Sequence, residues 1–246
     1  APAAGNPVTK GPTAMQSLPD GYRALVLGAT GAIGSAMAAQ LRADPRCAVV
    51  RTLARSSTPA LDFAAPDSIA AAAQALQTQG PWHLVLVANG MLQGATGHPE
   101  KRLADLNAAH MAASFSINTL GPALALAHFA PQLARGERSV FAVLSAKVGS
   151  IGDNRLGGWV SYRASKAALN MVVKTAAIEL ARTHPQCVLA ALHPGTVDSA
   201  LSAPFRGAQI GRPAQDAARD LLAVLDHLTP EDSGGFWAYD GQRLPW

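Results

Sequence analysis

The chain has 246 residues, of which 49% are hydrophobic and 15% charged. This length suits one α/β domain with a sizeable core, and the composition excludes a disordered or coiled-coil protein. Lysine and arginine (20) exceed aspartate and glutamate (16), giving a net charge of +4. Because this surplus is spread along the chain and no apolar run approaches the roughly 18 residues of a membrane span, we expect neither a nucleic-acid nor a membrane partner. A small anionic ligand would suit the positive charge.

The first 20 residues are rich in alanine, proline, glycine and threonine, and they lack the apolar stretch of a secretory signal. We predict that residues 1–20 form a flexible tail, with Met15 a candidate natural start, and that residues 21–246 form one domain. Cys47 and Cys187 lie in apolar surroundings, which predicts buried free thiols in a reducing compartment. No cysteine or histidine spacing typical of a metal site occurs, so no metal is expected. These features favour a cytoplasmic protein.

Short aliphatic runs alternate with longer alanine- and leucine-rich segments in the rest of the chain. The expected strands are Ala24–Leu27, Ala48–Leu53, Leu84–Ala88, Val140–Leu144, Val188–Leu192 and Phe236–Tyr239. The expected helical segments are Ile33–Ala43, Pro66–Gln79, Leu103–Leu133, Trp159–Thr183 and Pro213–Leu228. Uninterrupted apolar strands that alternate with helices are typical of a parallel sheet covered on both faces.

A glycine-rich turn follows the first expected strand. It reads Gly28-Ala29-Thr30-Gly31-Ala32-Ile33-Gly34 and leads into a helix. Glycines between strand and helix let the backbone approach a pyrophosphate, and the helix N-terminus favours its negative charge. The alternative is a tight turn that binds nothing.

The second expected strand ends before Arg55. A site for NAD needs an acidic residue at this place to bind the ribose 2′-hydroxyl, whereas an arginine accommodates a 2′-phosphate. No acidic residue occurs between Asp44 and Asp62, which favours NADP. The alternative is an arginine that is merely solvated.

Tyr162 and Lys166 are four residues apart and therefore share one face of a helix. An ammonium beside a phenol favours the phenolate and would lower the tyrosine pKa from about 10 toward neutrality. Such a tyrosine suits proton transfer to a carbonyl oxygen. The alternative is a solvated lysine near a core tyrosine.

The helical segment that contains this pair is apolar on nearly every side from Trp159 to Ala181. A helix that is apolar all round must be buried all round, and one domain seldom covers both faces. We therefore expect a homodimer or homotetramer formed through the helices at about 103–133 and 159–183.

These motifs together resemble the short-chain dehydrogenase/reductase family. The matching residues are Gly28–Gly34, Asn89-Gly90, Asn118-x-x-Gly121-Pro122, Ser145, Tyr162-x-x-x-Lys166 and Pro194-Gly195, in the family's order and spacing. The resemblance covers residues 23–246. It implies a single Rossmann-like, doubly wound α/β domain of about seven parallel strands with helices on both faces. It also implies hydride transfer between NADP(H), with NAD(H) as the alternative, and a small-molecule carbonyl or alcohol substrate.

The resemblance implies four catalytic residues. Tyr162 would exchange the proton with the substrate oxygen, and Lys166 would bind the nicotinamide ribose and depress the tyrosine pKa. Ser145 would hydrogen-bond the substrate carbonyl, and Asn118 would hold a water that joins Lys166 to solvent. For Asn118, stabilisation of a helix kink is a compatible structural role.

The cofactor residues are implied in the same way. Gly28, Thr30, Ile33 and Gly34 match the phosphate-binding turn, Arg55 the 2′-phosphate position and Asp62 a contact to the adenine. Asn89 and Gly90 match a wall behind the adenosine ribose, and Pro194, Gly195, Val197 and Ser199 match the loop over the nicotinamide. His193 adjoins that loop, where we expect a structural histidine.

The chain departs from the family pattern near the adenosine. Leu27 replaces the usual threonine, Ala32 replaces the usual middle glycine, and the ribose wall reads Val87-Ala88-Asn89-Gly90. These changes and the ending Phe236–Trp246 resemble the sniffer-type carbonyl reductases and C-factor-like proteins. Two alternatives to the reductase therefore stay open: a dinucleotide-binding signalling protein with little turnover, and a non-redox member that holds NAD tightly.

Overall fold

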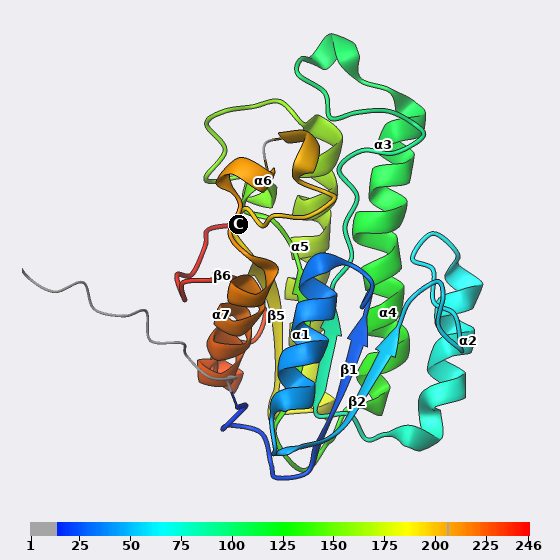
Figure 1. Cartoon of the computed structure of the whole chain (residues 1–246), viewed down its shortest axis with the longest axis vertical. Helices are drawn as coiled ribbons and strands as arrows, with labels where there is room; N and C mark the ends of the chain where they lie inside the picture. The colour runs from blue at the N-terminus through cyan, green and yellow to red at the C-terminus, as the bar shows by residue number, and fades with distance from the viewer. Residues whose placement is uncertain (1–13, 206) are drawn as a thin grey trace, which may run out of the picture.

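The centre of the molecule is a parallel sheet in a computed structural model that describes residues 14–205 and 207–246 (Figure 1). Within these residues the sheet has six strands in the order β2-β1-β3-β4-β5-β6, where about seven were expected. The strands are β1 Tyr22–Leu27, β2 Cys47–Leu53, β3 Leu84–Val87, β4 Ser139–Leu144, β5 Cys187–His193 and β6 Gly235–Ala238. Each coincides with one of the apolar runs in the sequence. The prediction of a single Rossmann-like α/β domain is confirmed.

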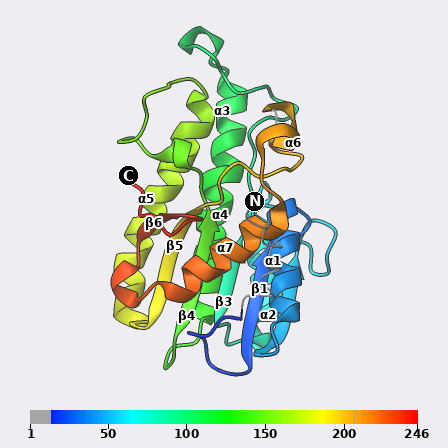
Figure 2. The same ribbon diagram turned by 60° about the vertical axis from the view of Figure 1, so that its left-hand side comes forward.

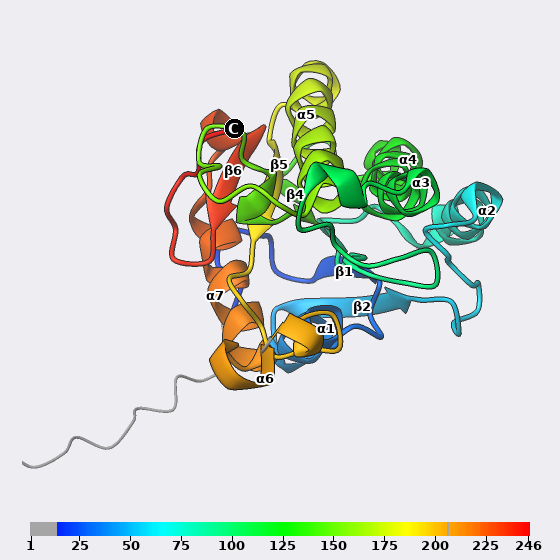
Figure 3. The ribbon, with the colours of Figure 1, turned by 90° about the horizontal axis from the view of Figure 1, so that it is seen from above.

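Helices cover both faces of this sheet, as Figure 3 shows from above. One face carries α1 (Ala32–Ala43) and α7 (Ala214–His227), and Figure 2 shows α7 in front of the sheet. The other face carries α2 (Pro66–Leu76), α4 (Gly121–Phe129) and α5 (Val160–Thr183), with α3 (Ala108–Phe115) continuing the line of α4. A short helix, α6 (Gly207–Ile210), lies beyond the carboxyl ends of the strands.

The alternation of side chains along each strand explains why both faces are covered. In β1, Leu25 and Leu27 pack with the core under α2, α4 and α5, while Ala24 and Val26 pack with the core under α1 and α7. All four are completely buried. Because successive strand residues point to opposite faces, an apolar run without alternation requires a helical layer on each side.

The chain reverses its direction across the sheet next to β1. It passes from β1 outward to the edge strand β2 and then returns to β3 on the other side of β1. In such sheets, ligands bind outside the carboxyl ends of the strands at this reversal point. The glycine turn after β1 and Asn89-Gly90 after β3 lie there.

The expected helix Leu103–Leu133 is interrupted. It consists of a 3₁₀ turn at Leu103–Asp105, helix α3, a π-helical turn at Ser116–Leu120, helix α4 and a second 3₁₀ turn at Ala130–Gln132. Single π turns inside helices often occur at functional sites. Here the wide turn contains Asn118.

The boundary of the predicted tail is wrong for its last seven residues. Met15 and Leu18 are buried, with 0% and 1% of their surfaces exposed. Both join the core beside α1 and α7, so the segment before β1 belongs to the domain. Its apolar residues were too few to stand out from the polar residues around them. Residues 1–13 of the predicted tail lie outside the described residues.

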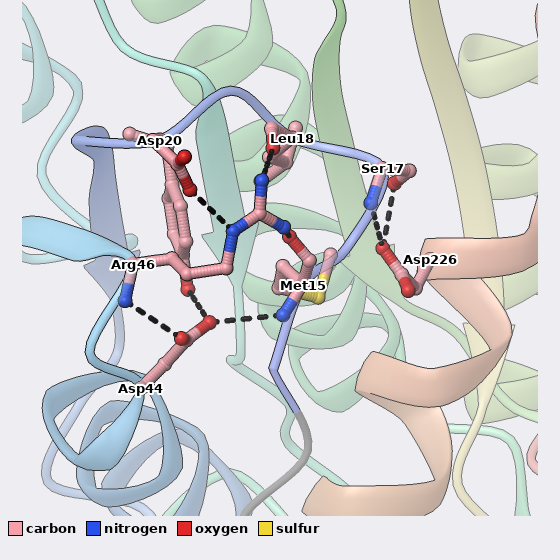
Figure 4. A network of polar contacts seen from close by, with 8 residues as sticks. Met15, Ser17, Leu18, Asp20, Asp44, Arg46 and Asp226 are labelled. Carbon is pink, nitrogen blue, oxygen red and sulfur yellow. Dashed lines mark hydrogen bonds and ion pairs between the residues drawn. The ribbon is translucent and has the colours of Figure 1, made fainter.

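Hydrogen bonds from the α1–β2 connection fix this segment (Figure 4). The Arg46 guanidinium donates to the carbonyls of Met15 and Leu18 at 2.7 and 2.8 Å. The buried carboxylate of Asp44 accepts from Met15 N and from the Tyr22 hydroxyl, both at 2.9 Å. Two carbonyls of this segment, those of Met15 and Leu18, thereby gain a charged donor.

No helix in residues 14–205 and 207–246 is long and apolar enough to cross a membrane.

Candidate active site

The glycine turn lies against the end of β3. Gly28 has φ +86°, and a Cβ on it would stand 2.8 Å from Ala88 O. A Cβ on Gly34 would stand 2.5 Å from Gly28 O. Only glycine fits at these two positions, because real Cβ atoms do not approach backbone oxygens so closely. No side chain caps the N-terminus of α1 at Gly31, so its first amides are available to an anion.

Two asparagines connect the end of β3 to the π turn. Asn118 is fully buried; its Oδ1 accepts from Met91 N at 2.7 Å and its Nδ2 donates to Met91 O at 2.8 Å. Asn118 Nδ2 also lies 3.1 Å from Ser165 Oγ on α5. Asn89 Nδ2 donates to Ile117 O at 2.6 Å. The segment that follows β3 is thereby fixed beside α5, which carries Tyr162 and Lys166.

Tyr162 and Lys166 are both buried, with 8% and 2% of their surfaces exposed. Lys166 Nζ donates to Leu144 O, at the end of β4, at 2.9 Å and lies 5.9 Å from the centre of the Tyr162 ring. A Cβ on Gly90 would stand 3.9 Å from Lys166 Nζ. The structure thus brings the helix pair, the end of β4 and the wall after β3 together.

Burial moves the pKa values of this pair in opposite directions. It raises the pKa of the Tyr162 phenol to about 12 and lowers the pKa of Lys166 to about 7. This corrects the expected fall of the tyrosine pKa toward neutrality. Removing a group from water disfavours its charged form, which for the phenol is the anion and for the amine is the cation. At neutral pH the Tyr162 phenol therefore keeps its proton.

Ser145 follows β4 and is buried against α5. Its hydroxyl donates to Asn170 Oδ1 at 2.7 Å, so it can donate to a substrate carbonyl only after it leaves this partner. The sequence reasoning missed Asn170. It is four residues after Lys166 and eight after Tyr162, and this helical spacing was a usable signal.

The loop after β5 contains four of the residues expected to bind the cofactor. Gly195 has φ +76°, and a Cβ there would stand 2.8 Å from the Tyr239 ring. Val197 is buried and pairs with Arg212 through the backbone, and Ser199 Oγ lies 3.2 Å from Ser202 Oγ. Pro194 precedes Gly195 in the same loop.

His193 ends β5 beside this loop. Its Nδ1 accepts from Lys147 N at 3.1 Å, and burial lowers the pKa of His193 to about 4. A neutral imidazole that accepts a backbone hydrogen bond fits the structural role expected for it.

The residues that were expected to bind the adenosine and the phosphates lie in separate surroundings, unlike Tyr162 and Lys166. Arg55 is exposed, and no ion pair or side-chain hydrogen bond joins it to the described residues. Asp62 Oδ1 accepts from Ala64 N at 3.0 Å before α2. Ile33 packs on the core beneath α1, and Thr30 lines a cavity of about 180 Å³ next to β2.

A second residue missed in the sequence is Glu100, which binds the start of α5. It is 2% exposed, and its carboxylate accepts from both the N–H (3.1 Å) and the hydroxyl of Ser161. No sequence signal marked it, because its partner is 61 residues away.

The sequence was compared with models of known protein families. Residues 22–209 match the family model for short chain dehydrogenases. The chain belongs to this family. Its sequence is 39% identical over 144 residues to C-signal of Myxococcus xanthus, covering 58% of this chain and 83% of that protein. It is 40% identical over 130 residues to 1-hydroxy-2-glutathionyl-2-methyl-3-butene dehydrogenase of Rhodococcus sp. (strain AD45), covering 53% of this chain and 56% of that protein.

Solved structures share the whole fold. An NADPH-bound carbonyl reductase from chicken fatty liver superimposes with a TM-score of 0.80 at 23% identity, covering 94% of this chain and 96% of that one. The carbonyl reductase Sniffer of D. melanogaster gives 0.78 at 18% identity, covering 92% and 99%. A short chain dehydrogenase from Burkholderia cenocepacia in complex with NADP gives 0.73 at 21% identity, covering 92% and 98%.

Proposed function

We propose that the protein is an NADP(H)-dependent oxidoreductase that reduces the carbonyl of a small molecule or oxidises the corresponding alcohol. The observation that supports this most is the buried pair of Tyr162 and Lys166 on one face of α5, beside the glycine turn at the reversal point of the sheet. The cofactors in the solved carbonyl reductase and short chain dehydrogenase structures point the same way.

The residues around the glycine turn fit a dinucleotide. The uncapped N-terminus of α1 offers amides to a pyrophosphate. Gly28 and Gly34 let the turn pack closely against its own backbone and the end of β3. When bound, the reduced nicotinamide supplies the hydride.

Tyr162 is the proton donor in this proposal. Its raised pKa keeps the phenol protonated at neutral pH, so it can hydrogen-bond the substrate carbonyl and transfer its proton to the oxygen as the carbon is reduced. Lys166, whose pKa lies near 7, can then return a proton toward the phenolate. Asn118 fixes the backbone beside this lysine, and Ser145 supports the carbonyl if its hydroxyl turns from Asn170.

The experiment that tests the proposal measures NADPH and NADH consumption with a panel of aldehydes, ketones, diketones and quinones. Replacing Tyr162 by phenylalanine removes the phenolic hydroxyl and keeps the aromatic ring. We expect Tyr162→Phe to bind NADPH as the wild type does and to lose about 10²-fold or more in kcat, because general acid catalysis is typically worth about 10²–10⁴-fold. A Tyr162→Phe enzyme with the wild-type rate would contradict the proton-donor role.

The similarity to C-signal favours one second candidate, a dinucleotide-binding signalling protein with little turnover. The same experiment separates the two functions. Tight NADPH binding without turnover on any substrate of the panel would favour signalling. NADPH-dependent turnover that Tyr162→Phe abolishes would favour the reductase.

A further inference from the structure

A polar cavity of about 180 Å³ lies between α1 and the end of the edge strand β2. The side chains that line it are small or polar, and they come from the glycine turn, from one face of α1 and from the end of β2. The lining residues are Ala29, Thr30, Ser35, Ala38, Arg42, Thr52, Ala54, Ser56 and Ser57. None of these is acidic, and the one charged residue among them is Arg42.

The secondary structure explains why these residues meet. Ser35, Ala38 and Arg42 recur at helical spacing and therefore lie along one side of α1. Helical side chains lean toward the helix N-terminus, so Arg42 in the last turn is directed toward the glycine turn. Ala38 is too small to block the space between the guanidinium and that turn.

The alternation of side chains along β2 excludes Arg51 from the cavity beside α1. Val50 packs with the core beneath α1, whereas Val49 and Leu53 pack with the core on the α2 side. Arg51 falls in the α2-facing set, and Thr52 falls in the α1-facing set that lines the cavity.

The polar groups of the cavity divide into committed and available ones. Ser57 Oγ accepts from Ala54 N at 2.9 Å and lies 2.8 Å from Ala54 O, so it shapes the turn. Within the described part of the chain, Arg42 has no ion pair or side-chain hydrogen bond, and the same holds for the hydroxyls of Thr30 and Ser56. A free guanidinium with nearby free hydroxyls suits a phosphate group.

We propose that Arg42 of α1 determines the preference of this protein for 2′-phosphorylated nucleotides, with Thr30 and Ser56 as further donors to the phosphate. The inference rests on the proposed use of NADP(H), because it concerns the same nucleotide site. It shifts the main charged contact from Arg55, which the sequence singled out, to Arg42 in the preceding helix; both side chains are exposed.

The test compares the binding of adenosine 2′,5′-bisphosphate with that of AMP, which lacks the 2′-phosphate, by titration calorimetry. We expect Arg42→Gln to raise the Kd of the bisphosphate by about 10- to 100-fold, since hydrogen bonds to charged groups contribute about 1.5–3 kcal/mol and 1.4 kcal/mol is tenfold. The Kd of AMP stays unchanged. Arg51→Gln, two positions after Val49 on the other face of β2, is the matched control and leaves both constants unchanged.

The outcomes separate the inference from the proposed function. A selective loss of about fivefold or more in Arg42→Gln, absent in Arg51→Gln, supports the role of Arg42; a smaller loss overturns it. A variant Arg55→Gln that loses the selectivity while Arg42→Gln keeps it also overturns the inference and leaves the NADP(H) proposal intact. Wild-type protein that binds the bisphosphate no better than AMP contradicts both.

Discussion

Burial controls the chemistry of the two side chains at the centre of the site. Tyr162 and Lys166 lie in the same low-dielectric place, yet burial makes the tyrosine a weaker acid and the lysine a stronger one. Near neutral pH the protonated phenol therefore stands beside an amine that is close to half protonated. In the proposed reaction, the phenol can give its proton to the substrate oxygen, and the protonated amine can then return a proton to the phenolate.

The lysine also links stability to pH. Because its pKa falls from 10.5 to about 7 on folding, the unfolded chain binds more protons than the native chain between these values, and the free energy of unfolding rises with pH. We expect this rise to be missing in Lys166→Met. From about pH 7 to about pH 9, wild-type stability should gain roughly 2 kcal/mol relative to the variant, at about 1.4 kcal/mol per pH unit.

Urea denaturation of both proteins at the two pH values measures this difference. Cys187, whose pKa burial raises from 9.0 to about 11, gives both proteins the same opposite slope above about pH 9, so its effect cancels from their difference. Parallel stability curves for wild type and Lys166→Met would contradict the burial of a titrating lysine.

At the scale of elements, the start of α5 is fixed by a loop from elsewhere in the chain. Trp159 precedes α5 in the left-handed region at φ 52°, and its N–H donates to Glu100 O at 2.6 Å. The Glu100 carboxylate binds Ser161, and the negative charge favours the positive end of the helix. Burial alone would raise the pKa of Glu100, but the hydrogen bonds from Ser161 hold it below its ordinary value. Tyr162 is the residue after Ser161, so these bonds also hold its backbone.

Glu100→Gln tests this attachment. The amide keeps one acceptor but places an NH₂ group against the donors of Ser161, so we expect the free energy of unfolding to fall by about 1–3 kcal/mol. The turnover number should fall as well, because the first turn of α5 holds Tyr162. Glu231→Gln, an exposed carboxylate at a short helix, is the control and should change stability by no more than about 0.5 kcal/mol. Equal effects of the two substitutions would show that the buried carboxylate does not fix α5.

At the scale of the whole molecule, the outer face of α5 stays uncovered within one copy of the chain. Met171 and Ile178, seven residues apart on this helix, are 66% and 56% exposed, and Leu120 of the neighbouring π turn is 48% exposed. Met171 and Ile178 lie on this face among the exposed Lys174, Thr175 and Glu179. Exposed apolar side chains rimmed by polar ones are typical of a protein interface. We propose that a second copy covers this face, which keeps the sequence-based prediction of a homodimer or homotetramer.

The double substitution Met171→Glu/Ile178→Glu should abolish that assembly, because paired copies would then bring unpaired carboxylates together. Light scattering after size-exclusion chromatography measures the mass. We expect the variant to have the mass of one chain and to bind NADPH as before. Leu156→Glu, at a 92% exposed loop position, is the control with unchanged mass. A variant that keeps the wild-type mass would place the interface elsewhere.

The amino-acid sequence by itself determined the positions of the strands and of most of the main helices. Short apolar runs that alternate with longer helix-forming segments are typical of strands buried on both faces, so the six strands were predictable from the sequence. The glycine turn and the spacing of Tyr162 and Lys166 were also visible, because both depend on residues close together in the chain.

Only the tertiary structure decided the properties that depend on distant neighbours. The direction of the Tyr162 pKa follows from burial by several elements, and the Ser145 hydroxyl is turned to Asn170 by the packing of β4 on α5. Met15 joins the domain because Arg46 and Asp44 bind its backbone across the fold. Burial and hydrogen-bond partners are set by which segments meet in space, and local sequence patterns do not contain that information.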